Sequence, residues 1–216
     1  MRLILSVLLF FGMSLELLAQ SDTSSKRLQD VVIYANKFPT LSKNIVQRVV
    51  ALTDKALIQQ QANTADILTA SGQVFVQKSQ AGGGSPVVRG FEASRVLLMV
   101  DGVRMNSAIF RAGHLQNIIT VDNMILDRVE IIYGPSSTLF GSDALGGVVN
   151  LFTKQPQLYK SNLVSKKAPW KTGGNFVYRY GNGQKENRQH IDINIANNKW
   201  AYLTSFTNSS FGDLRQ

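Results

Sequence analysis

Cysteine is absent from the 216-residue chain. Its absence excludes disulfide frameworks, thiolate catalysis, cysteine-ligated zinc sites and a cysteine-linked lipid anchor. Histidine occurs only twice, and the acidic residues do not gather into paired-acid or metal-ligand spacing. A Gly-x-Ser-x-Gly nucleophile elbow is also missing. These absences predict that the chain is not an enzyme and that it has no metal site.

Positive charge is in excess but is not concentrated anywhere. The chain has 23 Lys and Arg against 14 Asp and Glu, a formal net charge of +9. Only Lys26-Arg27 and Lys166-Lys167 are adjacent pairs, and no basic cluster alternates with aromatic residues as single-strand binding requires. We therefore expect no nucleic-acid partner. With 44% hydrophobic and 17% charged residues, the chain can build a core.

The N-terminus has the layout of a secretory signal. A short basic start, Met1-Arg2, precedes an apolar run over residues 3–13, and Leu17-Leu18-Ala19 offers a cleavage site. The run is too short to span a bilayer. A buried N-terminal helix is the alternative. We predict a signal peptide over residues 1–19 and export of the chain.

Short strands and helices are expected to alternate in the middle of the chain. Apolar residues recur at helical spacing over residues 54–69, and Gly72 follows as a stop signal. The apolar run 95–100 ends at Asp101-Gly102, which is a hairpin turn signal. Further strands are expected at 43–50, 74–77, 128–133 and 146–153, and short helices or turns at 122–126 and 136–140. Residues 81–86, rich in glycine, are expected to form a loop or turn.

The pattern changes after Pro156. From residue 174 onward, segments of alternating polarity occupy residues 175–180, 190–195 and 200–206, separated by turn residues. The first places Phe176, Tyr178 and Tyr180 on one face of a strand. Segments of about ten residues with alternating polarity are typical of outer-membrane barrel strands. A soluble antiparallel meander is the alternative interpretation of this region.

Three sequence blocks carry a family resemblance. Residues 86–91 (PVVRGF), 96–104 (VLLMVDGVR) and 127–150 (DRVEIIYGPSSTLFGSDALGGVVN) resemble, in order and spacing, the plug of TonB-dependent outer-membrane receptors. The resemblance extends over about residues 29–154. It implies an α+β plug domain, a small mixed sheet with short helices, followed by the first antiparallel strands of an incomplete transmembrane β-barrel.

The resemblance also implies a domain division and a location. We expect a signal peptide at 1–19, a flexible N-terminal segment with a TonB box at 20–36, a plug at 37–156 and the start of a barrel at 157–216. A plugged transporter barrel needs about 22 strands, so the barrel is expected to be truncated. The implied location is the cell outer membrane, with lipid around the barrel.

Two sets of residues acquire roles from the resemblance. The TonB box is expected to contact the periplasmic energy-coupling protein TonB by β-strand addition, through Asp30, Val31, Val32, Ile33, Tyr34 and Ala35. A strand within the plug fold is the alternative. Arg89, Arg128 and Glu130 are expected to form a polar network between plug and barrel, because charges beside apolar strands must pair. Ordinary fold-stabilising ion pairs are the alternative.

The ligand is suggested by one loop. Residues 110–117 (FRAGHLQN) resemble the plug loop of haem and haemoglobin receptors, in which a histidine is presented to the haem. Neutral imidazole is a sound axial ligand for haem iron, so His114 is the candidate contact. The predicted function is energised uptake of an iron carrier, haem or haemoglobin-derived haem, as a transported ligand rather than a prosthetic group. A siderophore or cobalamin receptor, or a stand-alone periplasmic binding module, is the alternative. His190 is expected to be structural.

Overall fold

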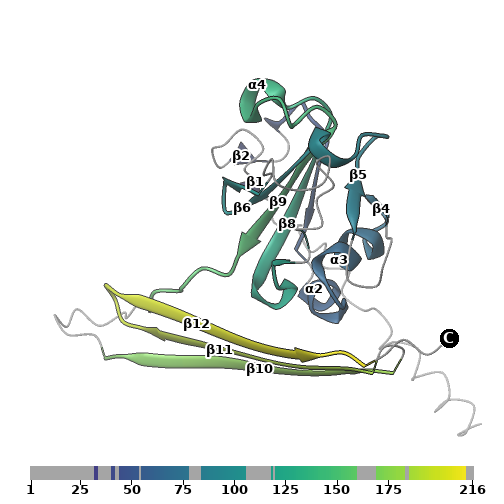
Figure 1. The fold of residues 1–216 in the computed structure, drawn as a ribbon. Coiled ribbons are helices and arrows are strands. Elements are labelled where there is room, and N and C mark those ends of the chain that lie inside the picture. The colour runs from purple at the N-terminus through teal and green to yellow at the C-terminus, as the bar shows by residue number, and fades with distance from the viewer. Residues whose placement is uncertain are drawn as a thin grey trace, which may run out of the picture. The chain divides into compact units, whose positions relative to one another are not determined.

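The computed structural model describes residues 32–33, 40–41, 44–53, 55–77, 84–105, 118, 120–159, 169–182 and 185–212. Residues 44–159 contain a mixed sheet with short helices, here called the mixed domain. Residues 169–212 contain a separate three-stranded sheet (Figure 1). The predicted signal peptide and His114 lie outside the described residues. The boundaries predicted at residues 19, 36 and 156 stay predictions.

A five-stranded sheet forms the centre of the mixed domain. Its strand order is β3-β8-β9-β6-β7, in which β6 and β9 run parallel and the other neighbours run antiparallel. The central strand β6 is a continuous apolar run, and most residues of β8 and β9 are buried, because both faces of the sheet are covered. The strands span Val49–Leu52 (β3), Val96–Val100 (β6), Val103–Arg104 (β7), Leu126–Tyr133 (β8) and Gly147–Thr153 (β9).

Each face of this sheet has its own core. On the first face, Val129, Val149 and Leu98 pack with side chains of two helices, α2 (Lys55–Gln60) and α3 (Thr64–Ala70), and of the hairpin β4 (Phe75–Gln77) and β5 (Ser85–Val87). On the second face, a smaller core gathers beneath α4 (Ser137–Phe140), formed by Leu97, Met99, Ile132, Phe140, Ala144 and Val148. The second face is therefore covered by less chain than the first.

The single helix predicted over residues 54–69 is wrong, because the structure divides it into α2 and α3. α2 ends at Gln60, and Asn63 is the N-cap of α3: its side chain accepts a hydrogen bond from the Asp66 backbone N–H at 2.9 Å. Asn is a preferred N-cap because it satisfies one of the free donors at a helix start. The helical spacing continues across this break, so the pattern alone did not reveal it.

Other local predictions are confirmed. Asp101 and Gly102 have φ of 47° and 84° in the turn that joins β6 to β7, as a two-residue hairpin requires. A 3-10 turn, η6 (Asn123–Ile125), lies where a short helix or turn was expected, and α4 ends at Gly141, with φ of 89°. A second 3-10 turn, η3 (Ala93–Arg95), was not expected. The strand predicted over 43–50 starts only at Val49.

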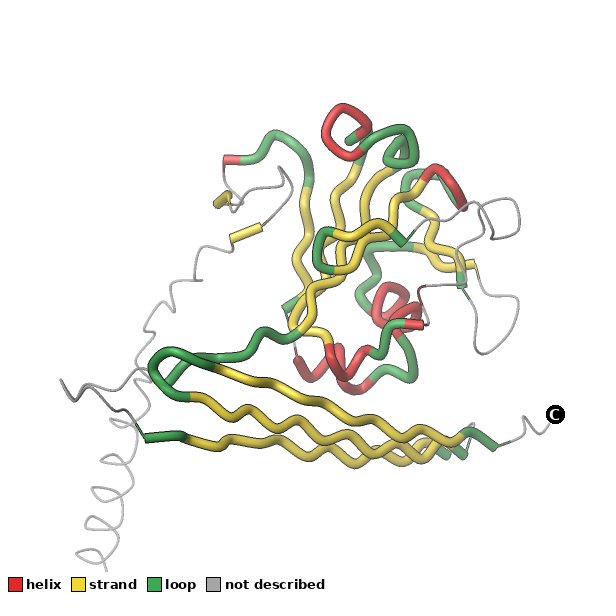
Figure 2. Tube along the Cα trace, turned by 60° about the vertical axis from the view of Figure 1, so that its left-hand side comes forward, coloured by secondary structure: helices red, strands yellow, loops and turns green. Residues whose placement is uncertain are grey.

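The three-stranded sheet consists of long strands in continuous register. They span Lys171–Gly181 (β10), Glu186–Ala196 (β11) and Ala201–Ser210 (β12), and they run antiparallel side by side (Figure 2). Each is longer than the segment predicted from alternation. Asn197 closes the turn between β11 and β12, where its side chain accepts from the Lys199 and Trp200 backbone N–H groups at 2.8 and 2.6 Å.

The two faces of this sheet differ in polarity. Phe176, Ile191 and Phe206 lie opposite one another on an exposed apolar face. On the other face of β11, four successive buried side chains are polar or charged, Glu186, Arg188, His190 and Asp192, and Ala196 is buried at the end of the strand. Apolar residues on one face and polar residues on the other are typical of barrel strands with a lipid face and a lumen face. None of the helices described has the length and apolar character needed to cross a membrane.

Candidate functional site

A buried polar cluster joins the mixed domain to β11. His190 is 1% exposed, with Nδ1 2.6 Å from Thr207 Oγ1 and Nε2 2.8 Å from Asp192 Oδ1. Asp192 also accepts hydrogen bonds from Lys154 Nζ at 2.5 Å and Ser205 Oγ at 2.7 Å. Lys154 directly follows β9, so this ion pair ties the end of the mixed domain to the three-stranded sheet. Both ring nitrogens of His190 are engaged, which agrees with a structural role.

Glu130 and Arg128 form a buried ion pair on β8. The Glu130 side chain is 0% exposed, and its Oε1 accepts a hydrogen bond from Arg128 Nε at 2.9 Å. The Arg128 guanidinium also lies 3.9 Å from the centre of the Phe152 ring and 3.5 Å from Asp127. Two residues apart on a strand, the pair shares one face of the sheet. A buried carboxylate needs such partners to remain ionised.

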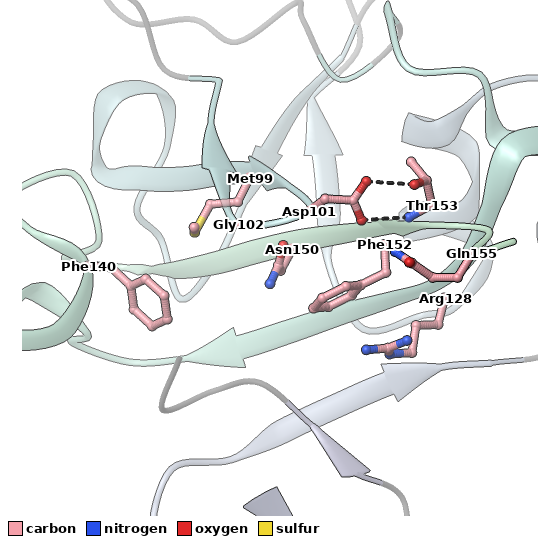
Figure 3. Close-up of a pocket in the computed structure, with 9 residues that line it drawn as sticks. All are labelled: Met99, Asp101, Gly102, Arg128, Phe140, Asn150, Phe152, Thr153 and Gln155. Carbon is pink, nitrogen blue, oxygen red and sulfur yellow. Dashed lines mark hydrogen bonds between the residues drawn. The ribbon is translucent and has the colours of Figure 1, made fainter. Parts of the chain in front are cut away.

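Arg128, the more exposed partner of this pair, lines an open pocket on the second face of the sheet. The pocket has a volume of about 660 Å³ and is lined by Met99, Asp101, Gly102, Arg128, Phe140, Asn150, Phe152, Thr153 and Gln155. Figure 3 shows Asn150 and Phe152 between Phe140 at one end and Arg128 with Gln155 at the other. The Asp101 carboxylate accepts from Thr153 N and Oγ1 at 2.9 and 2.6 Å, which fixes one rim.

Asn150 gives this pocket a free hydrogen-bond acceptor. Its side chain is buried, at 4% exposure, and its Oδ1 has no hydrogen-bond partner among the residues that the structure describes. An unsatisfied buried acceptor is costly, so a donor entering the pocket would gain a hydrogen bond there. Among the described residues, no three side chains of the metal-ligating types converge on one point.

Arg89 lies in a different environment from the Arg128–Glu130 pair. It is exposed in a turn, with φ of 52°, and its guanidinium is 6.0 Å from the Tyr133 ring centre, while that of Arg48 is 5.3 Å away. The Tyr133 hydroxyl donates to Gln73 O at 2.5 Å. Burial raises the pKa of Tyr133, and the nearby Arg48 and Arg89 lower it by less. The predicted network of Arg89 with Arg128 and Glu130 toward a barrel stays a prediction.

Comparison with known proteins identifies the mixed domain. Residues 42–148 match the protein family described as the TonB-dependent Receptor Plug Domain. These residues are a TonB-dependent receptor plug. The plug is followed by antiparallel strands of an incomplete barrel, as the resemblance implied, and β10, β11 and β12 are called the wall strands below. The family assignment places the chain in the outer membrane.

Similar proteins support the plug and the fold. The vitamin B12 transporter BtuB of Vibrio vulnificus (strain CMCP6) is 35% identical over 139 residues, which are 62% of this chain and 22% of that protein. The copper transporter OprC superposes with a TM-score of 0.61 and 17% identity over 77% of this chain and 24% of that one. The ferripyoverdine receptor of the outer membrane of Pseudomonas aeruginosa superposes with a TM-score of 0.54 and 18% identity. The superposition covers 76% of this chain and 20% of that one.

The match covers only part of these relatives. The chain spans about a fifth of the length of the curated relatives that it matches, 22% and 20% in the first two. The matching relatives are transporters and receptors rather than enzymes, which fits the prediction that the chain is not an enzyme. They include cobalamin and siderophore proteins, and the three described above do not single out haem.

The predicted TonB box is described only at its centre. Val32–Ile33 forms β1 and pairs antiparallel with Thr40–Leu41, which forms β2. Asp30, Val31, Tyr34 and Ala35 lie outside the described residues, as does His114. The contact with TonB and the haem contact therefore stay predictions. The β1–β2 pair is a sheet of its own, separate from the five-stranded sheet of the plug.

Sequence reasoning missed the residues that join plug and wall. Lys154, Asp192 and Arg188 were not singled out, although alternate residues of β11 from 186 to 192 are all polar or charged. That period of two was a usable signal for a lumen-facing stripe. The alternation was recognised only from residue 190, so the first two members, Glu186 and Arg188, were left out.

Proposed function

We propose that the chain is the plug-bearing part of an outer-membrane receptor that takes up a metal-bearing ligand with energy supplied through TonB. The observation that carries the proposal is a plug whose buried polar residues meet the polar face of the wall strands, as in the Lys154–Asp192 pair at 2.5 Å. A plug held by hydrogen bonds and ion pairs rather than by an apolar core can be moved at modest cost. Movement of the plug is what transport through its barrel requires.

The relatives favour cobalamin as the first ligand to test. The 35% identity to a vitamin B12 transporter lies over residues that are mostly plug. The solved relatives carry ferripyoverdine or transport copper at 17% to 18% identity. These ligands share a metal, either as an ion or held in an organic chelate. We therefore rank cobalamin first and ferric siderophores second.

Uptake in whole cells tests the proposed function. Cells that carry the intact gene are expected to accumulate radiolabelled cyanocobalamin, and deletion of either that gene or tonB is expected to reduce accumulation to the level of passive leakage. Binding at the surface should persist without TonB, because only the energised step needs the partner. Accumulation that survives the loss of tonB would contradict energy coupling. Uptake of a ferric siderophore in the same assay, without uptake of cyanocobalamin, would reassign the ligand.

Haem is a second candidate because of the loop that contains His114. His114→Ala is expected to weaken haem binding by the receptor at least about tenfold, since a ligand bond of 1.4 kcal/mol already contributes that factor. The Soret band of bound haem should shift as the axial ligand is lost. Gln116→Ala changes the same loop without removing an imidazole and is the control. Equal affinity and an unchanged Soret band in His114→Ala would remove the haem hypothesis.

We also assign a holding role to the predicted polar network. Arg128, which holds the buried Glu130, lines the open pocket, where Asn150 Oδ1 has no hydrogen-bond partner among the described residues. Side chains from further wall strands could complete this set, and their exchange would accompany movement of the plug. The support is the burial of Glu130 at 0% exposure beside a pocket that the described residues leave open.

A further inference from the structure

Five consecutive backbone carbonyls, in the last turn of α2 and in the two residues after it, each accept a hydrogen bond from a side chain. They belong to residues 58–62 and are called here the α2 carbonyl cluster. An α-helix leaves its last four carbonyls without partners in the helix, and α2 ends at Gln60. Its last turn contains no basic residue of its own. The groups that satisfy the cluster come from elsewhere in the chain.

Asn123 of η6 supplies the donors for two of the five carbonyls, those of Ile58 and Gln61. Its Nδ2 donates to Ile58 O at 2.7 Å and to Gln61 O at 2.8 Å. The side chain is 1% exposed, and its Oδ1 accepts from Arg188 Nη1 at 2.5 Å. The amide nitrogen of Asn123 thus donates to the end of the plug helix α2, while its amide oxygen accepts from an arginine of the wall strand β11. It links the plug to the wall directly.

Two wall arginines supply the remaining donors. Arg188 Nη2 donates to Ala62 O at 2.7 Å and its Nε to Ser209 Oγ of β12 at 2.9 Å. Arg179 Nη1 donates to Gln60 O at 2.6 Å and lies 3.5 Å from Gln59 O. Cations are favourable at a helix C-terminus because the carbonyls there carry partial negative charge. The planar guanidinium can serve several acceptors at once.

The charge of these arginines is balanced by carboxylates of both the wall and the plug. Glu186 bonds to Arg179 and lies 3.6 Å from Arg188, and Asp122 of the plug is 3.9 Å from Arg188. Arg188 is buried, at 6% exposure, so these carboxylates offset the cost of removing its charge from water. The guanidinium is thereby held in place with its donors aimed at the α2 carbonyl cluster.

We propose that the α2 carbonyl cluster is the seat by which the resting plug is fastened to its wall, with Arg188 and Arg179 as its ligands and Asn123 as the positioning residue. The proposal deepens the proposed function, in which the plug must be held before it is moved. The wall arginines donate to the backbone carbonyls of Gln59, Gln60 and Ala62, and Arg188 also donates to the side chain of the positioning residue Asn123. Release of this contact frees the α2–α3 turn.

Cysteine is absent from these 216 residues, so a thiol introduced at the seat is identified by comparing its labelling with that of the parent receptor. Gln61→Cys places one reporter thiol in the seat while keeping the backbone carbonyl, and its reaction with a maleimide is followed in isolated outer membranes. No inner-membrane partner is present there, so the rate reports the resting contact. Arg179→Gln combined with Arg188→Gln is expected to raise the labelling rate about tenfold or more, because hydrogen bonds from charged groups are replaced by weaker ones.

Two controls distinguish loss of the seat from loss of the fold. Lys199→Gln removes one positive charge from the exposed turn between β11 and β12 and should leave the rate unchanged. Ala144→Cys, at a plug position of 0% exposure, should stay unlabelled in every background. If Ala144→Cys becomes labelled in the double variant, the fold has been loosened and Arg188→Lys is used instead. Lysine keeps the charge but loses the forked donors, so Gln61→Cys should then be labelled at a rate between those of the parent and of the double variant.

The outcome is independent of transport. An unchanged labelling rate in the arginine variants, or the same increase in Lys199→Gln, would overturn the seat. Failure of the receptor to take up cobalamin or any other ligand would overturn the proposed function and leave this result intact. A faster rate in Arg179→Gln/Arg188→Gln with Ala144→Cys still protected would establish that the wall arginines fasten the plug.

Discussion

Val32→Pro is expected to abolish energised uptake while leaving ligand binding at the cell surface unchanged. β-Strand addition depends on backbone N–H and C=O groups, and proline removes one donor and fixes φ near −65°. Loss of this donor leaves its acceptor on the partner strand unpaired, which costs about 1–3 kcal/mol and weakens the strand contact by about 5-fold to 150-fold. The measurement is accumulation of labelled ligand by cells in parallel with binding to their outer membranes.

The pairing of Val32–Ile33 with Thr40–Leu41 makes this experiment more informative. One side of the predicted TonB box is engaged by β2, so a partner strand must either use the other side or replace β2. Thr40→Pro weakens only the internal pair and is expected to preserve uptake. Val32→Thr keeps the N–H and the β propensity and serves as the matched control. Full uptake in Val32→Pro would show that the box lies elsewhere.

The central sheet could be predicted from the sequence because its signals are local. β6 is an apolar run, β8 ends in the β-prone run Val129 to Tyr133, and Asp101-Gly102 is a turn that only a few residue pairs adopt readily. The division of α2 from α3 could not be predicted in the same way. Apolar spacing reports which side chains face the core, and both helices face the same core, so the period persists across Asn63.

The candidate site was only partly predictable, for a related reason. Arg128 and Glu130 are two residues apart on a strand, so their spacing alone places them on one face, where they form an ion pair at 2.9 Å. The α2 carbonyl cluster has no such signature, because its acceptors are backbone atoms and its donors lie up to 126 positions away in the sequence. Only the tertiary structure brings Arg188 to Ala62.

Gly147→Ala is expected to unfold the plug or to destabilise it by about 3 kcal/mol, the upper end of the usual cost of overpacking a tight core. Gly147 opens β9, where it lies opposite Tyr133 of β8. A Cβ atom there would lie 2.5 Å from Ile132 O and 3.0 Å from Val88 Cγ1. The first neighbour is backbone within a paired strand, so it cannot rotate away as a flexible side chain could. This close approach explains why the third family block has glycine at this position.

Gly173→Ala is the matched control for this prediction. It makes the same substitution in a strand, β10, where a Cβ would meet nothing within 4 Å. Urea denaturation followed by proteolysis of the plug should show an early transition for Gly147→Ala and a parental one for Gly173→Ala. Because the plug would be lost with the wall strands unaltered, Gly147→Ala should also make outer membranes more permeable to large antibiotics. Equal denaturation midpoints for the two variants would mean that the β8 backbone at Ile132 shifts to admit the added Cβ. The contact between β8 and β9 would then be looser than the structure describes.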